Sequence, residues 1–186
     1  KFFSFEDPNI DKETLVELRA HDHYSMCAGK YAEEEYVQWT DYSSIKETTY
    51  DALYKSVAML AVASIMLRNY PSGDRNVYIW QVAGTLWHHK VDEDDALKII
   101  EVVCNAAGDE EVKGRLAKAK HVYKPDTPQK EIVGLPTLAK GLSWSDKQIN
   151  NLKDALYAVT GRSALPTFTH DFVERIAYMM KQKKYY

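Results

Sequence analysis

Cysteine is scarce in this chain, with only Cys27 and Cys104 among 186 residues. The two lie in unrelated sequence contexts, so neither a disulfide framework nor a cysteine-based zinc site is supported. This usage fits a reducing compartment, and we expect a cytoplasmic protein.

Long apolar runs are also missing. The longest covers residues 57–67 and is closely bounded by Lys55 and Arg68. A bilayer-spanning helix needs about 20 consecutive apolar residues, so we expect no membrane span and no membrane partner. The aromatic start of the chain has neither the basic region nor the continuous apolar region of a signal peptide.

Several catalytic motifs do not occur in the sequence. It has no Gly-x-x-x-x-Gly-Lys-Ser/Thr loop, no Gly-x-Gly-x-x-Gly after a strand and no Gly-x-Ser-x-Gly elbow. The carboxylate runs at residues 33–35 and 93–95 are typical of a solvated strand end and a helix start. We therefore assign no catalytic residue and expect the chain to be non-catalytic alone.

Histidine pairs do not predict a metal site. His21 and His23 alternate on a predicted strand, which would point both rings to one face, but no third ligand follows at suitable spacing. His88 and His89 are adjacent on a predicted helix and diverge by about 100°.

The composition is that of a folded protein, with 45% hydrophobic and 27% charged residues. The net charge of −3 hides an asymmetry, because residues 1–50 carry −6, residues 51–112 carry −5 and residues 113–186 carry +8. A basic segment of this kind indicates an anionic partner, since Lys and Arg near phosphates release condensed counterions. A solvated face that happens to be basic is the alternative.

Residues 15–39 favour two or three short strands, because β-branched, aromatic and aliphatic residues are separated there by glycine and acidic residues. Strands this short have no core of their own. They must lie on helices or belong to a sheet that starts before Lys1.

From Thr48 onward, apolar residues recur at helical spacing. We predict helix starts at Thr48-Thr49, Asp74, Asp92 and Asp109, and a capping box of Ser145 with Gln148. Gly108 and Gly161 should end helices. The expected helices run from Thr49 to about Tyr70, from Asp74 through Trp87, from Asp92 to Gly108, from Asp109 to about Tyr123, briefly after Pro136, from Ser145 to Gly161, and from Thr169 onward.

Two groups of residues are candidates for binding phosphate. Arg75 and Asn76 lie at a predicted helix start, where free N–H groups and the helix dipole favour an anion. Lys113, Lys120 and Lys124 fall on one stripe of the fourth helix at steps of seven and four. Arg115 and Lys118 are expected to flank this stripe.

Trp80 and Trp87 are seven residues apart on the second helix. They share a predicted face with Val77 and Gly84, so we interpret them as core anchors. Platforms for base stacking are the alternative.

Three patches occur in order along the chain: Gly73-Asp74-Arg75-Asn76 running into residues 82–86, then residues 105–111 (Asn-Ala-Ala-Gly-Asp-Glu-Glu), then residues 133–139 (Val-Gly-Leu-Pro-Thr-Leu-Ala). Their order and spacing resemble the helical region that follows the catalytic domain in primase-polymerases of plasmids, phages and archaeal mobile elements. The resemblance covers roughly residues 50–142.

A second match concerns residues 15–19, Tyr24 and residues 36–39, which look like the last strands of that family's catalytic domain. Glu17 would then occupy the position of the third metal-binding carboxylate. The family's first acidic motif and its Ser-x-His motif belong upstream, so we expect this chain to be a piece of a longer protein.

The resemblance implies a role in DNA replication. It suggests that the bundle binds single-stranded template and nucleoside triphosphates, with ATP or another triphosphate and Mg²⁺ used by the full-length protein. It also implies neighbouring primase and helicase domains.

We therefore predict a mainly α fold, a bundle of about five to seven helices with a short N-terminal β segment. The predicted domains are residues 1–46 (end of a catalytic domain), 47–142 (bundle) and 143–186 (helix pair leading to a helicase domain). The main hypothesis is a template-binding module of a primase-polymerase. A protein-interaction module joining primase to helicase is the second hypothesis, and an enzyme with Glu17 and His21 or His23 as metal ligands is the third.

Overall fold

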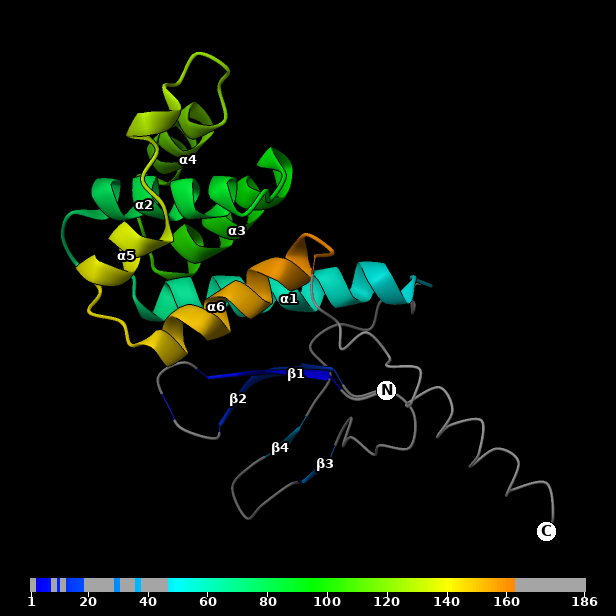
Figure 1. The fold of residues 1–186 in the computed structure, drawn as a ribbon. Coiled ribbons are helices and arrows are strands. Elements are labelled where there is room, and N and C mark those ends of the chain that lie inside the picture. Colours follow the sequence, from blue (N-terminus) through cyan, green and yellow to red (C-terminus); the bar gives the residue numbers. More distant parts are fainter. Residues whose placement is uncertain are drawn as a thin grey trace, which may run out of the picture.

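A computed structural model describes residues 3–7, 10, 13–18, 29–30, 36–37 and 47–162. This part of the chain contains six α-helices, one 3₁₀ turn and four short strands. The predicted class, a mainly helical bundle with a short N-terminal β segment, is confirmed. Figure 1 shows the long helix α1 across the middle, with the β1–β2 hairpin on one side and α2 to α4 on the other.

Helix α1 (Tyr50–Arg68) is the centre of the bundle. Its predicted cap is confirmed, since the Thr49 side chain accepts a hydrogen bond from the Ala52 N–H at 3.2 Å. Among the described residues it is the one helix long and apolar enough to cross a membrane by length and composition. In the bundle, Ala61, Val62 and Met66 of this helix are fully buried.

Helices α2 (Arg75–His88) and α3 (Glu93–Ala106) follow close to their predicted bounds. Helix α4 (Val112–Val122) does not start at Asp109 as predicted, because Asp109 lies in the turn before it and Glu111 is the N-cap residue. Gly108 has a φ of +66°, and the next residue, Asp109, donates its N–H to the carbonyl of Cys104 at 2.9 Å. This left-handed turn closes α3 as the sequence predicts.

Two of the predicted caps need correction. Asp74 and Asp92 occupy the N-cap positions of α2 and α3, but neither side chain makes a capping hydrogen bond. Asp74 has a left-handed backbone, with a φ of 51°. The residue type identified the helix start correctly, whereas the expected capping hydrogen bond does not form.

The later helices are short or cleanly capped. A 3₁₀ turn, η1 (Gln129–Glu131), precedes α5 (Leu135–Gly141), and α6 (Asp146–Val159) follows. The predicted capping box is present, with both reciprocal hydrogen bonds between Ser145 and Gln148. The helix predicted from Thr169 lies outside the described residues.

Helix α6 packs along α1 and contributes Leu152, Ala155 and Leu156 to the same core as α1 to α5. Trp144 lies just before the N-cap of α6. Its indole N–H donates to the side chain of Asn69, just after α1, at 3.2 Å. The predicted domain division after residue 142 stays a prediction, but α6 itself belongs to the bundle core.

The strands form two antiparallel pairs. β1 (Phe3–Glu6) pairs with β2 (Thr14–Leu18), and β3 (Gly29–Lys30) pairs with β4 (Tyr36–Val37). The β1–β2 hairpin lies on α1 and α6, as expected of strands without a core of their own. Phe5 is buried there, and Arg68 at the end of α1 pairs with the buried carboxylate of Asp7.

The three sequence patches meet in space at two contacts. In the first, a Cβ added to Gly84 of α2 would lie 1.9 Å from the carbonyl oxygen of Val133, so helix and loop touch backbone to backbone. The His88 ring supports the same loop, with its Nε2 2.9 Å from the Ile132 carbonyl oxygen. In the second, Arg75 at the start of α2 reaches Asp109. The patches therefore connect α2 to the loop before α5 and to the turn between α3 and α4.

Candidate nucleic-acid interface

The start of α2 lies beside the start of α4. A hollow of about 370 Å³ is lined by Arg75, Asn76 and Arg115 together with the turn before α2. A neighbouring hollow of about 610 Å³ is lined by Asn76, Lys113 and Arg115 and by the acidic residues before α4. The structure therefore brings together four of the residues singled out from the sequence.

The buried carboxylate of Asp109 connects the residues that surround these hollows. Its side chain is fully buried and accepts hydrogen bonds from the Tyr70 hydroxyl, from Nε of Arg115 at 3.0 Å and from the backbone N–H of Glu111 at 2.7 Å. Arg75 approaches the same carboxylate at 3.9 Å. A buried carboxylate that is shared in this way fixes the turn between α3 and α4 against the ends of α1 and α2.

These contacts determine the charge of the corner. Burial acts to raise the pKa of Asp109, but the hydrogen bonds from Tyr70, Glu111 and Arg115 outweigh it and lower the pKa to about 2. Burial, together with the hydrogen bond to Asp109, raises the pKa of Tyr70. At neutral pH the carboxylate is therefore ionised and Tyr70 remains a neutral donor.

Arg115 does not flank an exposed stripe, and that expectation is corrected. Its side chain is only 8% exposed, with Nε on Asp109 and Nη2 on Glu111 at 2.9 Å. The reason is helix geometry, since residue 115 is rotated by about 200° from residue 113 and faces the core. The spacing of basic residues along the sequence does not reveal that Arg115 forms an ion pair with Asp109.

Arg75 differs from Arg115 because it makes only one long ion pair among the described residues. Its side chain is 34% exposed, its guanidinium carbon lies 5.9 Å from the Tyr70 ring centroid, and its Nε is buried with no hydrogen-bond partner in the described part of the chain. Asn76, beside it, is exposed. A half-exposed arginine of this kind keeps donors for an external oxygen anion.

The lysines of α4 face in two directions. Lys113, Lys120 and Lys124 are exposed, and Lys120 is 64% exposed although its Nζ lies 4.0 Å from Glu93. Lys118 is half-buried and points to α2, with its Nζ 6.0 Å from the Trp80 ring centroid. Lys113 and Lys120, seven residues apart, share one exposed side of α4, and Lys124 is exposed just after its C-cap residue.

The predicted roles of the tryptophans as core anchors agree with their packing. Trp80 and Trp87 are half-buried and pack against the hydrophobic core, while Val77 is 53% exposed and marks the outer border of their face. Trp80 also lies beside His121 of α4, with ring centroids 6.0 Å apart.

The metal hypothesis gains no support among the described residues, in which no group of three or more His, Cys, Asp or Glu side chains is arranged to hold an ion. Glu17 is half-buried in β2, where it is registered opposite Ser4. His21 and His23 lie outside the described residues.

The sequence did not reveal Asp109 and Tyr70 as partners of Arg75 and Arg115. The sequence pattern places Asp109 only at a helix start. Its place directly after the left-handed Gly108 was the available signal, because a residue there leaves the helix and turns back over it.

Comparison with models of protein families, with curated proteins and with solved structures found no match to this chain. The resemblance to primase-polymerases therefore stays a prediction carried by the three patches.

Proposed function

We propose that this chain is the helical module of a primase-polymerase that binds single-stranded template and initiating nucleotides during primer synthesis. The observation that carries the proposal is a set of exposed lysines, Lys113 and Lys120 on α4 and Lys124 just after it, which begins beside Arg75 and Asn76 at the start of α2. In this proposal the chain positions nucleic acid, and the chemistry belongs to a neighbouring catalytic domain.

The lysine row suits a phosphate backbone. Lys113 and Lys120 are seven residues apart, which corresponds to about 10 Å along the helix axis at 1.5 Å per residue. Lys124 follows the C-cap residue Tyr123 and extends the row. Positive charges in a line of this length attract a strand without reading its sequence.

Arg75 and Asn76 add a second type of contact. They stand over the hollows between α2 and α4, where the free N–H groups of a helix start favour oxygen anions. Arg115 has a positioning role in this proposal, because its ion pairs with Asp109 and Glu111 hold the two helix starts together. The proposed ligand of this corner is the triphosphate of a nucleotide, which would meet Arg75 and Lys113, although Glu110 and Glu111 also line the larger hollow.

The test replaces Lys113, Lys120 and Lys124 together by Glu and measures binding of a fluorescent single-stranded DNA by anisotropy at several salt concentrations. We expect affinity to fall at least tenfold. The slope of log affinity against log salt should fall by about 2, at about 0.7 for each lost phosphate contact on a single strand.

A matched control replaces Lys98, Lys130 and Lys140, which are exposed and lie off this row, by Glu. It makes the same change in net charge, so it separates a local contact from general attraction. Equal losses in the two triple variants would refute the proposed path for the strand.

A second candidate function, a module that joins primase and helicase domains, is favoured by one observation. A mainly apolar hollow of about 240 Å³ between α1 and α3 is lined by Met59, Ala63 and Ile99, with Leu60 and Val102 each more than half exposed at its rim. Exposed apolar residues gathered in this way often mark protein contacts. Replacing Leu60 and Val102 by Lys should abolish co-elution with the neighbouring domains in gel filtration while leaving DNA affinity unchanged.

A further inference from the structure

Another hollow lies where the end of α2, the start of α3 and the end of α4 meet. It has a volume of about 320 Å³ and is lined by Trp87, Lys90, Val91, Asp92, Glu93 and Tyr123. Two aromatic rings and two carboxylates therefore converge on one space. Aromatic faces with carboxylates beside them bind organic cations.

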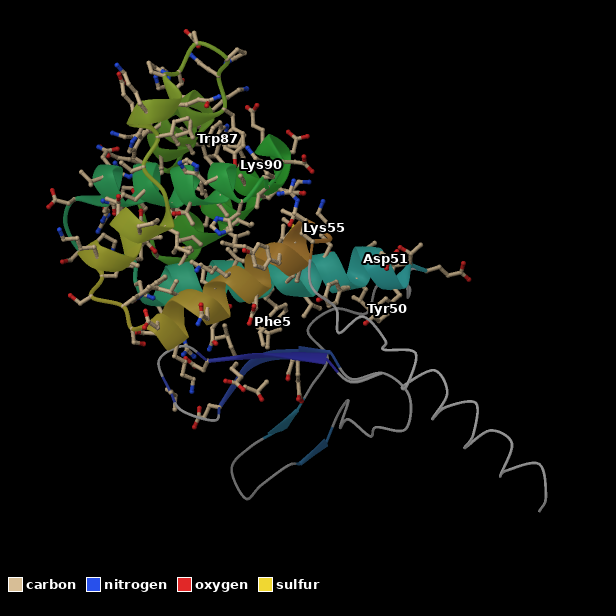
Figure 2. The ribbon with its side chains drawn as sticks, in the orientation of Figure 1. Phe5, Tyr50, Asp51, Lys55, Trp87 and Lys90 are labelled. Carbon is tan, nitrogen blue, oxygen red and sulfur yellow. The ribbon has the colours of Figure 1, made fainter. Side chains whose placement is uncertain are left out.

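One wall already holds a cation. The ammonium of Lys90 lies over the Trp87 ring, 4.8 Å from its centroid. Lys90 is exposed and has a left-handed backbone, with a φ of 64°, in the turn that ends α2. Figure 2 shows Trp87 and Lys90 close together at this end of the helical layer. The face of the Trp87 ring thus contacts an ammonium group. That ammonium belongs to Lys90, whose side chain is exposed to solvent.

One polar group of the hollow, the Tyr123 hydroxyl, is buried and has no hydrogen-bond partner in the described part of the fold. Burial raises the pKa of Tyr123, and the charges of Glu93 and Asp92 raise it further. A buried hydroxyl without a partner costs free energy unless a ligand satisfies it.

Asp92 adds a second carboxylate, whose charge also acts on Lys55 and helps to raise the pKa of that lysine. It stands at the N-cap of α3 but makes no capping hydrogen bond, and in the described part of the chain it has no ion pair. Glu93 has only the long 4.0 Å approach of Lys120. On the other side of this acidic helix start, Asp95 is occupied by Lys55 and Lys98. The acidic charge facing the hollow is therefore available to a ligand.

We propose that this hollow binds the ammonium group of a lysine side chain from a partner protein, and that Lys90 occupies the Trp87 face until the partner displaces it. The ammonium would lie on the Trp87 ring, donate to Asp92 and Glu93, and place its remaining donor at the Tyr123 hydroxyl. A phosphate chain is disfavoured at this position because Asp92 and Glu93 would face it. The proposal makes no use of the corner between the starts of α2 and α4, although Glu93 of this hollow lies 4.0 Å from Lys120 of the proposed strand path.

The experiment titrates the ¹⁵N-labelled chain with a short glycine peptide that contains one lysine, and follows the indole N–H signal of Trp87. The matched probe replaces the lysine by norleucine, which keeps the alkyl stem and removes the charge. We expect a saturable shift with the lysine peptide and none with the norleucine peptide. Equal shifts from the two peptides would show that the ammonium is not recognised.

Variants separate binding from folding. Lys90→Ala should raise the affinity for the lysine peptide about two- to fivefold, the gain expected from removing one exposed cation–π competitor. Lys140→Ala, at an exposed lysine of α5, is the control and should leave affinity unchanged. An unchanged affinity in Lys90→Ala would overturn the proposed competition.

Tyr123→Phe and Asp92→Asn test the polar groups of the hollow. Both should lower affinity for the lysine peptide several-fold and leave the urea midpoint of the chain unchanged or slightly raised, since neither group bonds within the described structure. A lowered midpoint with unchanged affinity would assign these residues a structural role and refute the binding site.

Discussion

At the scale of single residues, the most consequential group is the carboxylate of Asp109. It is buried, ionised and shared by Tyr70, Arg115 and the Glu111 N–H. Breaking a buried ion pair by removing one partner leaves the other charge unsatisfied. The proposed phosphate corner therefore depends on a residue that would not itself touch the phosphate.

Replacing Asp109 by Asn tests this dependence. We expect the free energy of unfolding at pH 7 to fall by about 3 kcal/mol, because Arg115 stays buried without its counter-charge. The measurement is urea denaturation followed by circular dichroism. Asp126→Asn, at an exposed loop position, is the control and should change stability by less than about 0.5 kcal/mol.

The stability difference between the wild type and Asp109→Asn should also depend on pH. Since the folded pKa of Asp109 is lowered to about 2, its ionised form stabilises the native state. That contribution is fully present above the unfolded pKa of about 3.9 and is lost as the pH falls through about 2. The stability gap between wild type and Asp109→Asn should therefore narrow below pH 4. A gap that stays constant down to pH 2 would contradict the ion-pair explanation.

At the scale of elements, the contact between α2 and the loop before α5 decides how closely the helices pack. Gly84 allows the Val133 carbonyl to reach the helix backbone, and Gly134 lies against the His88 ring. The sequence patches at residues 82–86 and 133–139 are thus in direct backbone contact with each other. Glycine is needed there for space, and its backbone conformation is ordinary.

Gly84→Ala should destabilise the chain by about 2 kcal/mol or more, because the added methyl would overlap a backbone oxygen that cannot turn aside. Gly114→Ala in α4 is the matched control, since nothing lies within 4 Å of its added Cβ. It should stabilise the chain by about 0.5–1 kcal/mol through helix propensity. Thermal unfolding of both variants measures the contrast, and a shift of the same sign in both would refute the close-contact explanation.

Helix ends were predictable at this scale because their signals are local. The Ser145–Gln148 box, the Thr49 cap and the Gly108 turn depend on residues within a few positions of one another. Asp74 and Asp92 marked helix starts correctly but do not cap them. Whether a carboxylate turns to its own helix or away from it depends on neighbours that the local sequence does not contain.

At the scale of the whole molecule, the β1–β2 hairpin and α6 complete the core around α1 (Figure 1). Phe5 of the hairpin is buried in the same cluster as Tyr54 and Ala58 of α1. The β1–β2 hairpin is therefore packed onto the bundle, and we expect it to contribute to the stability of the bundle.

Phe5→Ala should lower the free energy of unfolding by about 3 kcal/mol, the usual cost of removing a buried aromatic ring. Ile10→Ala, in the segment between the two strands, removes a side chain that is 45% exposed and should cost less than about 0.5 kcal/mol. Guanidinium denaturation measures both. Equal stability of the two variants would mean that the hairpin unfolds independently of the bundle.

The sequence by itself determined the class of fold, the order of the helices, most of their ends and the basic character of α4, because periodicity, caps and charge are local properties. The start of α4 was predicted at Asp109 but lies at Val112. Only the tertiary structure decided which charges remain outside. It turned Arg115 inward to Asp109 and kept Lys113 and Lys120 exposed, since the side of α4 that packs on α2 and α3 is set by distant residues. It also assembled the hollow of Trp87, Asp92 and Tyr123, whose members come from three helix ends and share no pattern along the chain.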